Sequence, residues 1–183
     1  MKIKRILALM ALTTLTGCSS IDCSLDSVVV WTLTFYDSTT EEPMKLPCVL
    51  TVDAAGAGTL YNRGSNVEAM ELPMSHNAEA DTLYLRWAYP TNGNDQGGMS
   101  YAATDVLTIK HDNYGHFDAM DCPAAVFHTI TDAQFKTHSL AAFPIAIDSV
   151  RITRPQVDYQ DVENIRLYLN TSAIAVSNNS NSK

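Results

Sequence analysis

The sequence predicts an all-β domain, and three observations lead to this class. After residue 26, apolar and polar residues alternate with a period of two through most of the chain. Clusters of Gly, Pro, Asn, Asp and Ser separate the alternating runs, as turns separate strands. No long segment has the apolar period of an amphipathic helix. We therefore expect eight or nine short strands in an antiparallel β-sandwich, immunoglobulin-like in arrangement, with a partly open β-barrel as the alternative.

The first half of the domain supplies regular alternating runs, each with large apolar side chains on one face. Trp31 shares a face with Leu33 and Phe35, and Trp87 shares a face with Leu85. We therefore expect both tryptophans in the core, where their large apolar area is best buried. The expected strands in this half are Val28–Tyr36, Leu46–Asp53, Thr59–Asn62, Asp81–Ala88 and a short candidate at Val67–Leu72.

An irregular stretch rich in Gly, Asn and Asp, 89–103, interrupts the strands before the alternation resumes. In the second half, Leu107 and Ile109 share one inward face, and Ile165 and Leu167 share another. The expected strands here are Thr104–His111, Tyr114–Asp118, Ala124–Thr131, Ile145–Thr153 and Asn164–Leu169.

The amino-terminal segment has the order of a bacterial lipoprotein signal. A basic start precedes the apolar run Ile6–Leu12, and Leu15–Cys18 places a cysteine at the cleavage point. The apolar run is too short to span a bilayer, which takes about 20 residues, and the thiol of Cys18 can carry a thioether-linked lipid. The predicted organisation is a signal peptide (1–17), a lipidated amino terminus and tether (18–26), one sandwich domain (27–169) and a polar tail (170–183).

The charge balance excludes some classes of partner. The chain has 12 Lys and Arg residues against 20 Asp and Glu. Removal of residues 1–17 takes away three basic residues and no acidic one, so nine basic residues remain and the formal charge becomes −11. Nucleic acids and anionic lipid surfaces bind to basic patches, so neither is an expected partner. The remaining 166 residues suit one domain with a substantial core.

The cysteines indicate an oxidising compartment. With Cys18 lipidated, three cysteines remain. Cys48 lies on the apolar face of its expected strand, so we read it as a small buried core residue. Cys23 and Cys122 both lie in polar, irregular stretches, and we predict that they pair, with other arrangements left open. Five residues from Cys18 to Cys23 reach at most about 17 Å, so this bond would hold the domain close to the membrane.

A series of short motifs follows in order along the chain. They are the cysteine motif Leu15–Cys18 (the lipobox), Cys23, Thr34–Asp37, Val52–Gly56, Leu72–Ser75, Leu107–His111, Asp121–Cys122, Phe127–Ile130, Ile147–Val150 and Asn164–Tyr168. In these motifs the mature chain resembles a family of uncharacterised small lipoproteins from Bacteroidetes-type Gram-negative bacteria. The resemblance covers nearly the whole mature chain, but no motif in it has catalytic specificity.

The resemblance implies a compartment and a fold more than an activity. It supports the pairing of Cys23 with Cys122, since cysteines at these places look characteristic of the group. Cys48 and the glycine-rich stretch Gly93–Gly98 look like departures particular to this chain. Such lipoproteins are often encoded beside an outer-membrane β-barrel protein, which suggests a barrel of this kind as a partner.

The densest polar stretch, Lys110–Asp118, contains His and Asp side chains that could bind a metal ion, but we favour another interpretation. In an extended chain Asp112, Tyr114, His116 and Asp118 point the same way. Imidazole and carboxylate groups can bind zinc. A helical HxxxH pair and a paired CxxC are both missing from the sequence. We favour a solvated turn with local side-chain hydrogen bonds, and we expect no metal and no cofactor.

Catalysis is not expected either. His128 alternates with Val126 and Ile130, which predicts a partly buried structural histidine bonded to a neighbour. No Ser, Cys or Thr lies in a recognisable nucleophile elbow. The usual signatures of an active site are therefore missing, and we predict a protein that is not an enzyme.

A few side chains remain as candidates for binding a ligand. They are aromatic or polar residues of the long loop and the polar stretch, where exposure is expected. The candidates are Tyr89, Tyr101, Tyr114, His116 and Asp118.

The expected function is that of a non-enzymatic accessory or protein-interaction module, anchored to the membrane by its amino-terminal lipid. The expected partner is an envelope protein, such as an outer-membrane β-barrel. The alternative is a sandwich that binds a glycan or a metal. Ser19–Asp22 carries a single acid after Cys18 and matches an acidic surface-export signal poorly, so we expect the periplasmic face of the outer membrane.

Overall fold

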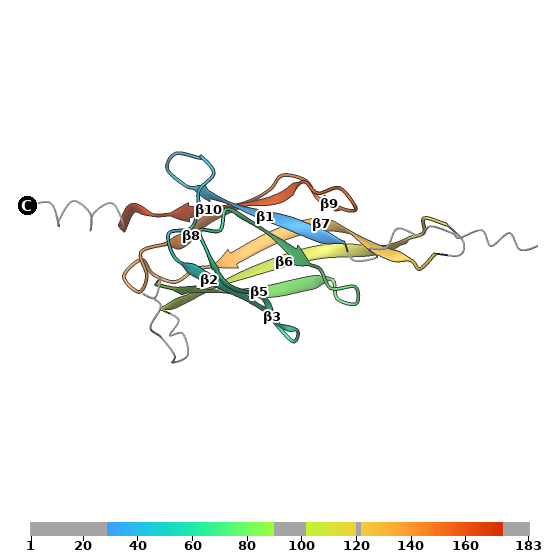
Figure 1. Cartoon of the computed structure of the whole chain (residues 1–183), viewed down its shortest axis with the longest axis horizontal. Helices are drawn as coiled ribbons and strands as arrows, with labels where there is room; N and C mark the ends of the chain where they lie inside the picture. Colours follow the sequence, from blue (N-terminus) through green and yellow to red (C-terminus); the bar gives the residue numbers. More distant parts are fainter. Residues whose placement is uncertain (1–28, 90–101, 120–121, 174–183) are drawn as a thin grey trace, which may run out of the picture.

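The computed structural model describes residues 29–89, 102–119 and 122–173, which form two stacked β-sheets (Figure 1). The predicted all-β sandwich is confirmed. The described strands are β1 (Val30–Asp37), β2 (Val49–Ala54), β3 (Gly58–Ser65), β4 (Ala69–Pro73), β5 (Ala80–Ala88), β6 (Ala103–His116), β7 (Ala125–Lys136), β8 (Ala146–Ile152), β9 (Gln156–Val157) and β10 (Glu163–Asn170).

The small sheet has the order β4-β1-β10-β8, and the large sheet has the order β3-β2-β5-β6-β7-β9. The large sheet is strongly curled, so the sandwich approaches the partly open barrel that the sequence left as an alternative. No helix among the described residues is long and apolar enough to cross a membrane. The predicted signal peptide, the tether and most of the polar tail lie outside the described residues.

The alternating runs predict the core well. Trp31 is 1% exposed and Trp87 is fully buried, and the apolar residues that share their faces are buried with them. Full burial of one large aliphatic side chain stabilises a fold by about 1.5–3 kcal/mol. The buried residues on these inward faces are Val29, Trp31, Leu33 and Phe35 in the first run, Leu46, Cys48, Leu50 and Val52 in the second, and Leu83, Leu85, Trp87, Leu107, Ile109, Ile165, Leu167 and Leu169 in later strands.

One pairing departs from the predicted antiparallel pattern. β1 runs parallel to β10, with Leu33 opposite Ile165, whereas the other described pairs are antiparallel. The buried amide of Asn164 fits this junction, since its Oδ1 accepts a hydrogen bond from the backbone N–H of Thr32 at 3.0 Å. β1 therefore lies inside its sheet, between β4 and β10. In an immunoglobulin constant-type domain, by contrast, the first strand lies at a sheet edge.

The hairpin β6–β7 also differs from the expectation of a solvated turn at Lys110–Asp118. Lys110 to His116 continue β6 and pair with β7. β5 begins at Ala80, opposite Lys110, so the part of β6 beyond this point no longer has β5 beside it. These six further residues extend the hairpin by about 20 Å past the end of β5. The short strand β9 flanks β7 over the first part of this length, and the end of the hairpin projects beyond it (Figure 1). The turn was mispredicted because the residues are polar, although one of them, His111, is buried, as described below.

Candidate functional site

The candidate ligand-binding residues lie at two opposite ends of the molecule. Tyr89 follows the end of β5, close to the start of β6, whereas Tyr114 and His116 lie near the other end of β6. A strand of 14 residues spans about 40 Å. The structure therefore does not bring Tyr89 together with the others, and Tyr101 lies outside the described residues.

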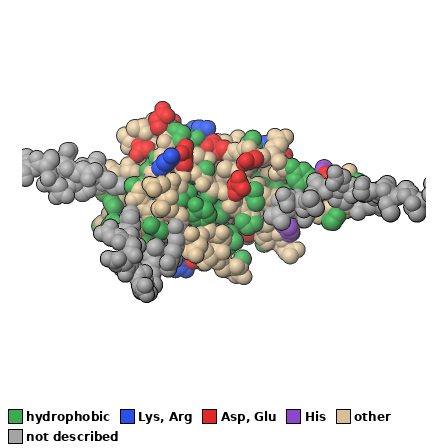
Figure 2. All heavy atoms as spheres, in the orientation of Figure 1, with side chains coloured by type: hydrophobic (Ala, Val, Ile, Leu, Met, Phe, Trp, Pro, Cys, Tyr) green, Lys and Arg blue, Asp and Glu red, His purple; other side chains and the backbone are tan. Residues whose placement is uncertain are grey.

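At the far end of β6, aromatic side chains form a cluster that we call the aromatic tip. The ring of His116 stacks on Phe127 with centroids 4.3 Å apart and planes 12° apart. Tyr159 meets Phe127 edge to face at 4.9 Å, and Tyr114 does so at 5.9 Å. We include Phe117 in the tip because it follows His116 directly and is 69% exposed. Figure 2 shows His side chains at this end of the molecule.

Hydrogen bonds hold the rings of the aromatic tip in place. Nε2 of His116 lies 3.1 Å from Oδ1 of Asp118, and the hydroxyl of Tyr159 donates to Oδ2 of the same carboxylate at 3.0 Å. Tyr114 and Tyr159 are each 45% exposed. The structure thus joins three of the predicted candidates, Tyr114, His116 and Asp118, and adds two rings from β7 and from the loop between β9 and β10.

Behind the aromatic tip, two histidines are buried around one amide. His111 is 1% exposed and His128 is fully buried. Oδ1 of Asn113 lies 2.7 Å from Nδ1 of His111 and 2.6 Å from Nδ1 of His128. The amide nitrogen of Asn113 donates to the carbonyls of His76 and Ala78, which fixes the amide oxygen as the acceptor for both rings. His128 is therefore hydrogen-bonded to a neighbour, as the sequence predicts, but it is fully rather than partly buried.

The environment of His128 disfavours its charged form. Burial is the largest cause, followed by the nearby His111 and His76, and together they lower the pKa of His128 to about 4. Asp81 acts in the opposite direction. Nε2 of His111 lies 3.3 Å from Oδ2 of Asp81 without forming a hydrogen bond. No group of three or more His, Cys, Asp and Glu side chains in the described part of the chain is arranged to hold a metal ion.

A second buried polar network surrounds Asp105, which is fully buried at the start of β6. Its Oδ2 accepts a hydrogen bond from Nε1 of Trp87 at 3.0 Å. Its Oδ1 accepts bonds from the backbone N–H of His138 at 2.7 Å and from the hydroxyl of Thr137 at 3.1 Å, and lies 2.6 Å from Nδ1 of His138.

The pair of Asp105 and His138 resembles the acid–histidine pair of a hydrolase, but no nucleophile faces the second ring nitrogen of His138 in the described structure. Nε2 of His138 faces the backbone carbonyl of Phe143 at 3.3 Å, and a carbonyl cannot act as a nucleophile. The pair therefore ties the end of β7 to β6 and to the following loop. This network was not predicted, although the spacing of Asp105 from Leu107 and Ile109 places all three on the same inward face of the strand.

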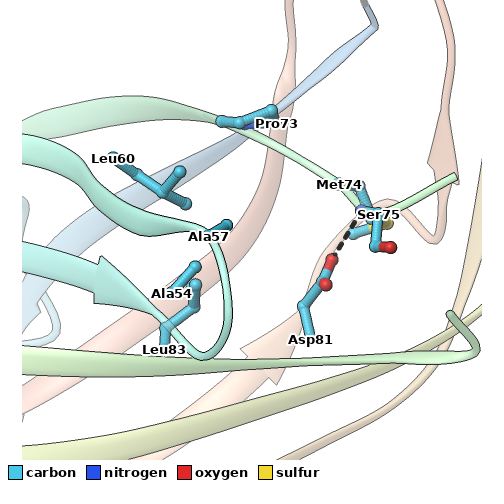
Figure 3. A pocket seen from close by; sticks show the side chains of 8 residues that line it. All are labelled: Ala54, Ala57, Leu60, Pro73, Met74, Ser75, Asp81 and Leu83. Carbon is cyan, nitrogen blue, oxygen red and sulfur yellow. Dashed lines mark hydrogen bonds between the residues drawn. The ribbon is translucent and has the colours of Figure 1, made fainter. Parts of the chain in front are cut away.

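The two sheets leave an open seam where β3 forms one edge of the large sheet and β4 one edge of the small sheet. A hollow of about 180 Å³ lies in this seam (Figure 3). Its walls are mostly apolar, and the polar groups at its side are Ser75 and Asp81, which are joined by a 2.8 Å hydrogen bond from the Ser75 N–H to Oδ2 of Asp81. The lining residues are Ala54, Ala57, Leu60, Pro73, Met74, Ser75, Asp81 and Leu83.

The cysteines are described in part. Cys48 is free and 3% exposed, which confirms it as a small core residue, and burial raises the pKa of its thiol to about 12. Cys18 and Cys23 lie outside the described residues, so the lipidation of Cys18 and the pairing of Cys23 with Cys122 stay predictions.

Comparison with known proteins places the chain in a family without assigning it an activity. No curated protein matches it, and no solved structure matches it. A family model described as a family of unknown function, DUF6452, matches residues 49–169, from the start of β2 almost to the end of β10. This chain therefore belongs to the DUF6452 family, which agrees with the resemblance to an uncharacterised family seen in the sequence.

Proposed function

We propose that the chain is a lipid-anchored lipoprotein of the Bacteroidetes-type cell envelope, whose sandwich is a non-enzymatic module that binds another envelope protein. The lipobox at Leu15–Cys18 supports the anchor. The acidic balance of the mature chain agrees with a protein partner rather than a nucleic acid. The membrane is the outer membrane, and the face is the periplasmic one.

The observation that carries the protein-binding role is the open seam between β3 and β4. Edge strands offer backbone N–H and C=O groups to a further strand, and added strands are a common mode of peptide recognition. The hollow beside the two edges has apolar walls from Leu60, Met74 and Leu83, and it holds the carboxylate of Asp81. The seam therefore suits an extended segment of the partner that carries an apolar side chain next to a basic one.

The seam can be tested by a matched pair of substitutions on β3. Leu60 lines the hollow, whereas Asn62, two residues further on, is exposed and does not. We expect Leu60→Glu to abolish in-cell crosslinking and pull-down of a membrane-protein partner, and Asn62→Glu to retain it. Circular dichroism and thermal unfolding of both variants verify that the fold is kept. Equal capture by the two variants would exclude the seam as the docking site.

The carboxylate in the seam gives a second, finer test. Asp81→Asn removes the charge that we expect to attract a basic side chain, while it keeps a group able to accept the bond from Ser75. Capture of the partner should then weaken and lose part of its dependence on salt concentration. An unchanged salt dependence would show that Asp81 does not face a basic group.

The anchor is tested separately. Cys18→Ala should release the protein from the membrane fraction into the soluble periplasmic fraction, because the lipid attaches to this thiol. Retention of the Cys18→Ala variant in the membrane would contradict the lipoprotein assignment. Non-reducing peptide mapping of the native chain should join Cys23 to Cys122, and free thiols at both positions would refute that bond.

A further inference from the structure

We infer that the aromatic tip inserts into the interfacial region of the bilayer that holds the chain's own lipid. The sandwich would then contact the membrane through the end of its β6–β7 hairpin. This inference rests on the proposed lipid anchor. It specifies which end of the domain faces the membrane and which side chains contact the lipid.

The first ground is the exposure of large rings at the end of a narrow ribbon. Phe117 is 69% exposed, and Tyr114 and Tyr159 are 45% exposed each. Tyr114 lies on the part of β6 beyond β5, Phe117 follows the end of that strand, and Tyr159 comes from the loop between β9 and β10. Tyrosine combines an apolar ring with a polar hydroxyl, which favours the boundary between water and lipid. A bilayer surface can receive such rings without a complementary groove.

The second ground is the place where the chain enters the domain. Val29 and Val30 line a hollow of about 230 Å³ together with Asp158 and Tyr159, so the first described residues lie beside a ring of the aromatic tip. Figure 1 shows the start of β1 and the end of the hairpin at the same end of the molecule. Eleven residues separate Cys18 from Val29, a reach of at most about 40 Å. The chain therefore enters the domain at the end that carries the aromatic tip.

The predicted disulfide would shorten this tether further. Cys122 follows Asp118 by four residues, so a bond to Cys23 would place the lipidated Cys18 within five residues of the hairpin end. Tethering at this range raises the effective concentration of membrane surface around the rings to the millimolar scale. Rings that bind a bilayer weakly on their own would then stay in contact with it.

The charges near the aromatic tip define the kind of surface that it fits. Asp112 and Asp118 are acidic, whereas the charge of Asp158 is balanced by Arg154 at 2.7 Å. The carboxylates of Asp112 and Asp118 would be repelled by an anionic lipid surface. The contact therefore depends on burial of the rings and on the tether, and we expect it on zwitterionic bilayers. It should change little with salt concentration, in contrast to a polybasic contact.

The experiment uses the full lipid-modified chain in phosphatidylcholine vesicles that contain lipids brominated near the headgroup. An indole is introduced at the tip by Phe117→Trp and, in a matched control, at the opposite end by Tyr89→Trp, where the native ring is 57% exposed. The native Trp31 and Trp87 are buried and supply the common background. We expect a blue-shifted, strongly quenched signal from Phe117→Trp and an unquenched signal from Tyr89→Trp.

The outcomes separate this inference from the proposed anchor. If the native chain fails to float with the vesicles, the anchor proposal fails, and the tip inference fails with it. If the chain floats but Phe117→Trp is not quenched, or is quenched no more than Tyr89→Trp, the anchor stands and the inference is overturned. A photo-crosslinker at residue 117 that captures a protein in cells, in the absence of quenching, would assign the aromatic tip to a protein partner instead.

Discussion

The side-chain oxygen of Asn113 lies 2.6 Å from Nδ1 of the fully buried His128. The same oxygen lies 2.7 Å from Nδ1 of His111, so one amide on β6 joins two buried imidazole rings from β6 and β7. The amide nitrogen of Asn113 donates to two carbonyls of the loop between β4 and β5. A single polar side chain thus connects the hairpin to the body of the sandwich.

Removal of this amide should be costly. We expect Asn113→Ala to lower the free energy of unfolding by about 2–4 kcal/mol, because two buried imidazole N–H groups lose their acceptor. Urea unfolding followed by tryptophan fluorescence measures the loss. Asp112→Ala, at the exposed neighbouring position, is the control and should stay within about 0.5 kcal/mol of the native chain. Similar losses in both variants would contradict the role given to Asn113.

The stability of the domain should depend on pH through His128. Its folded pKa of about 4 lies below the ordinary value of 6.5, so between these values the unfolded chain binds a proton that the folded chain does not. The contribution of neutral His128 to the free energy of unfolding is complete above pH 6.5 and is lost as the pH falls to 4. The total loss is on the order of 3 kcal/mol. His111, His76 and Asp81 are the titratable groups that face the ring.

Urea unfolding at a series of pH values tests this dependence. His128→Gln removes the titrating group and should flatten the curve between pH 6.5 and 4. The carboxylates of Asp37 and Asp158 have lowered pKa values and act in the same direction, but below pH 3.8. An equally steep curve for the native chain and for His128→Gln would assign the dependence to other groups.

Asp105 should be among the most sensitive positions in the domain. Asp105→Ala removes the partner of Trp87, Thr137 and His138, and leaves buried polar groups without an acceptor. We expect a loss of about 3–5 kcal/mol, as found when one partner of a buried pair is removed. Thermal unfolding measures it, and Asp148→Ala, at an exposed position of β8, is the control. A small loss at Asp105 would show that the network contributes little.

Cys48 should be protected from alkylation in the folded chain. Its thiol is 3% exposed and has a pKa of about 12, so very little reactive thiolate is present at pH 8. Iodoacetamide followed by mass spectrometry should label Cys48 only after denaturation. Rapid labelling of the native chain at this residue would mean that the strand carrying it opens easily.

The sequence predicted the core because burial follows a local pattern in the strands. Trp31, Leu33 and Phe35 face inward in the order that a period of two requires, and so do Leu83 and Leu85. Local alternation does not report which strands pair. The parallel register of Leu33 with Ile165 joins residues 132 positions apart, so nothing in either run could reveal it. The two-residue strand Gln156–Val157 was missed because it is too short to alternate.

The site was predicted less completely than the fold. Of the predicted candidates, Tyr114, His116 and Asp118 lie close together because they are close in the sequence: the first two are on β6, and Asp118 follows its end. Tyr159 could not be added from the sequence, because it comes from a loop 41 residues beyond Asp118 and meets it only through the pairing of β7 with β9. The hollow in the seam could not be predicted from the sequence either, because β3 and β4 belong to different sheets and local patterns do not show how the sheets stack.

In the β6–β7 hairpin, a polar composition does not mean that every side chain is exposed. His111 and His128 are buried although both are polar, because each supplies a group that Asn113 can satisfy. Polar residues in such numbers usually indicate solvent exposure, and the turn was predicted on that basis. Only the position of Asn113 between the two rings, which needs the paired hairpin, makes burial favourable.

The parallel pairing of β1 with β10 has a consequence for the order in which the chain can fold. The hairpins of the large sheet join neighbouring segments and can form as soon as those segments are present. β1 is the first of the described strands, yet one of its two neighbours, β10, is the last of them. During synthesis the amino end emerges first, so the small sheet cannot close until residues 163–170 have followed. If the chain is exported as we propose, the sandwich would be completed only after the whole domain has crossed the membrane.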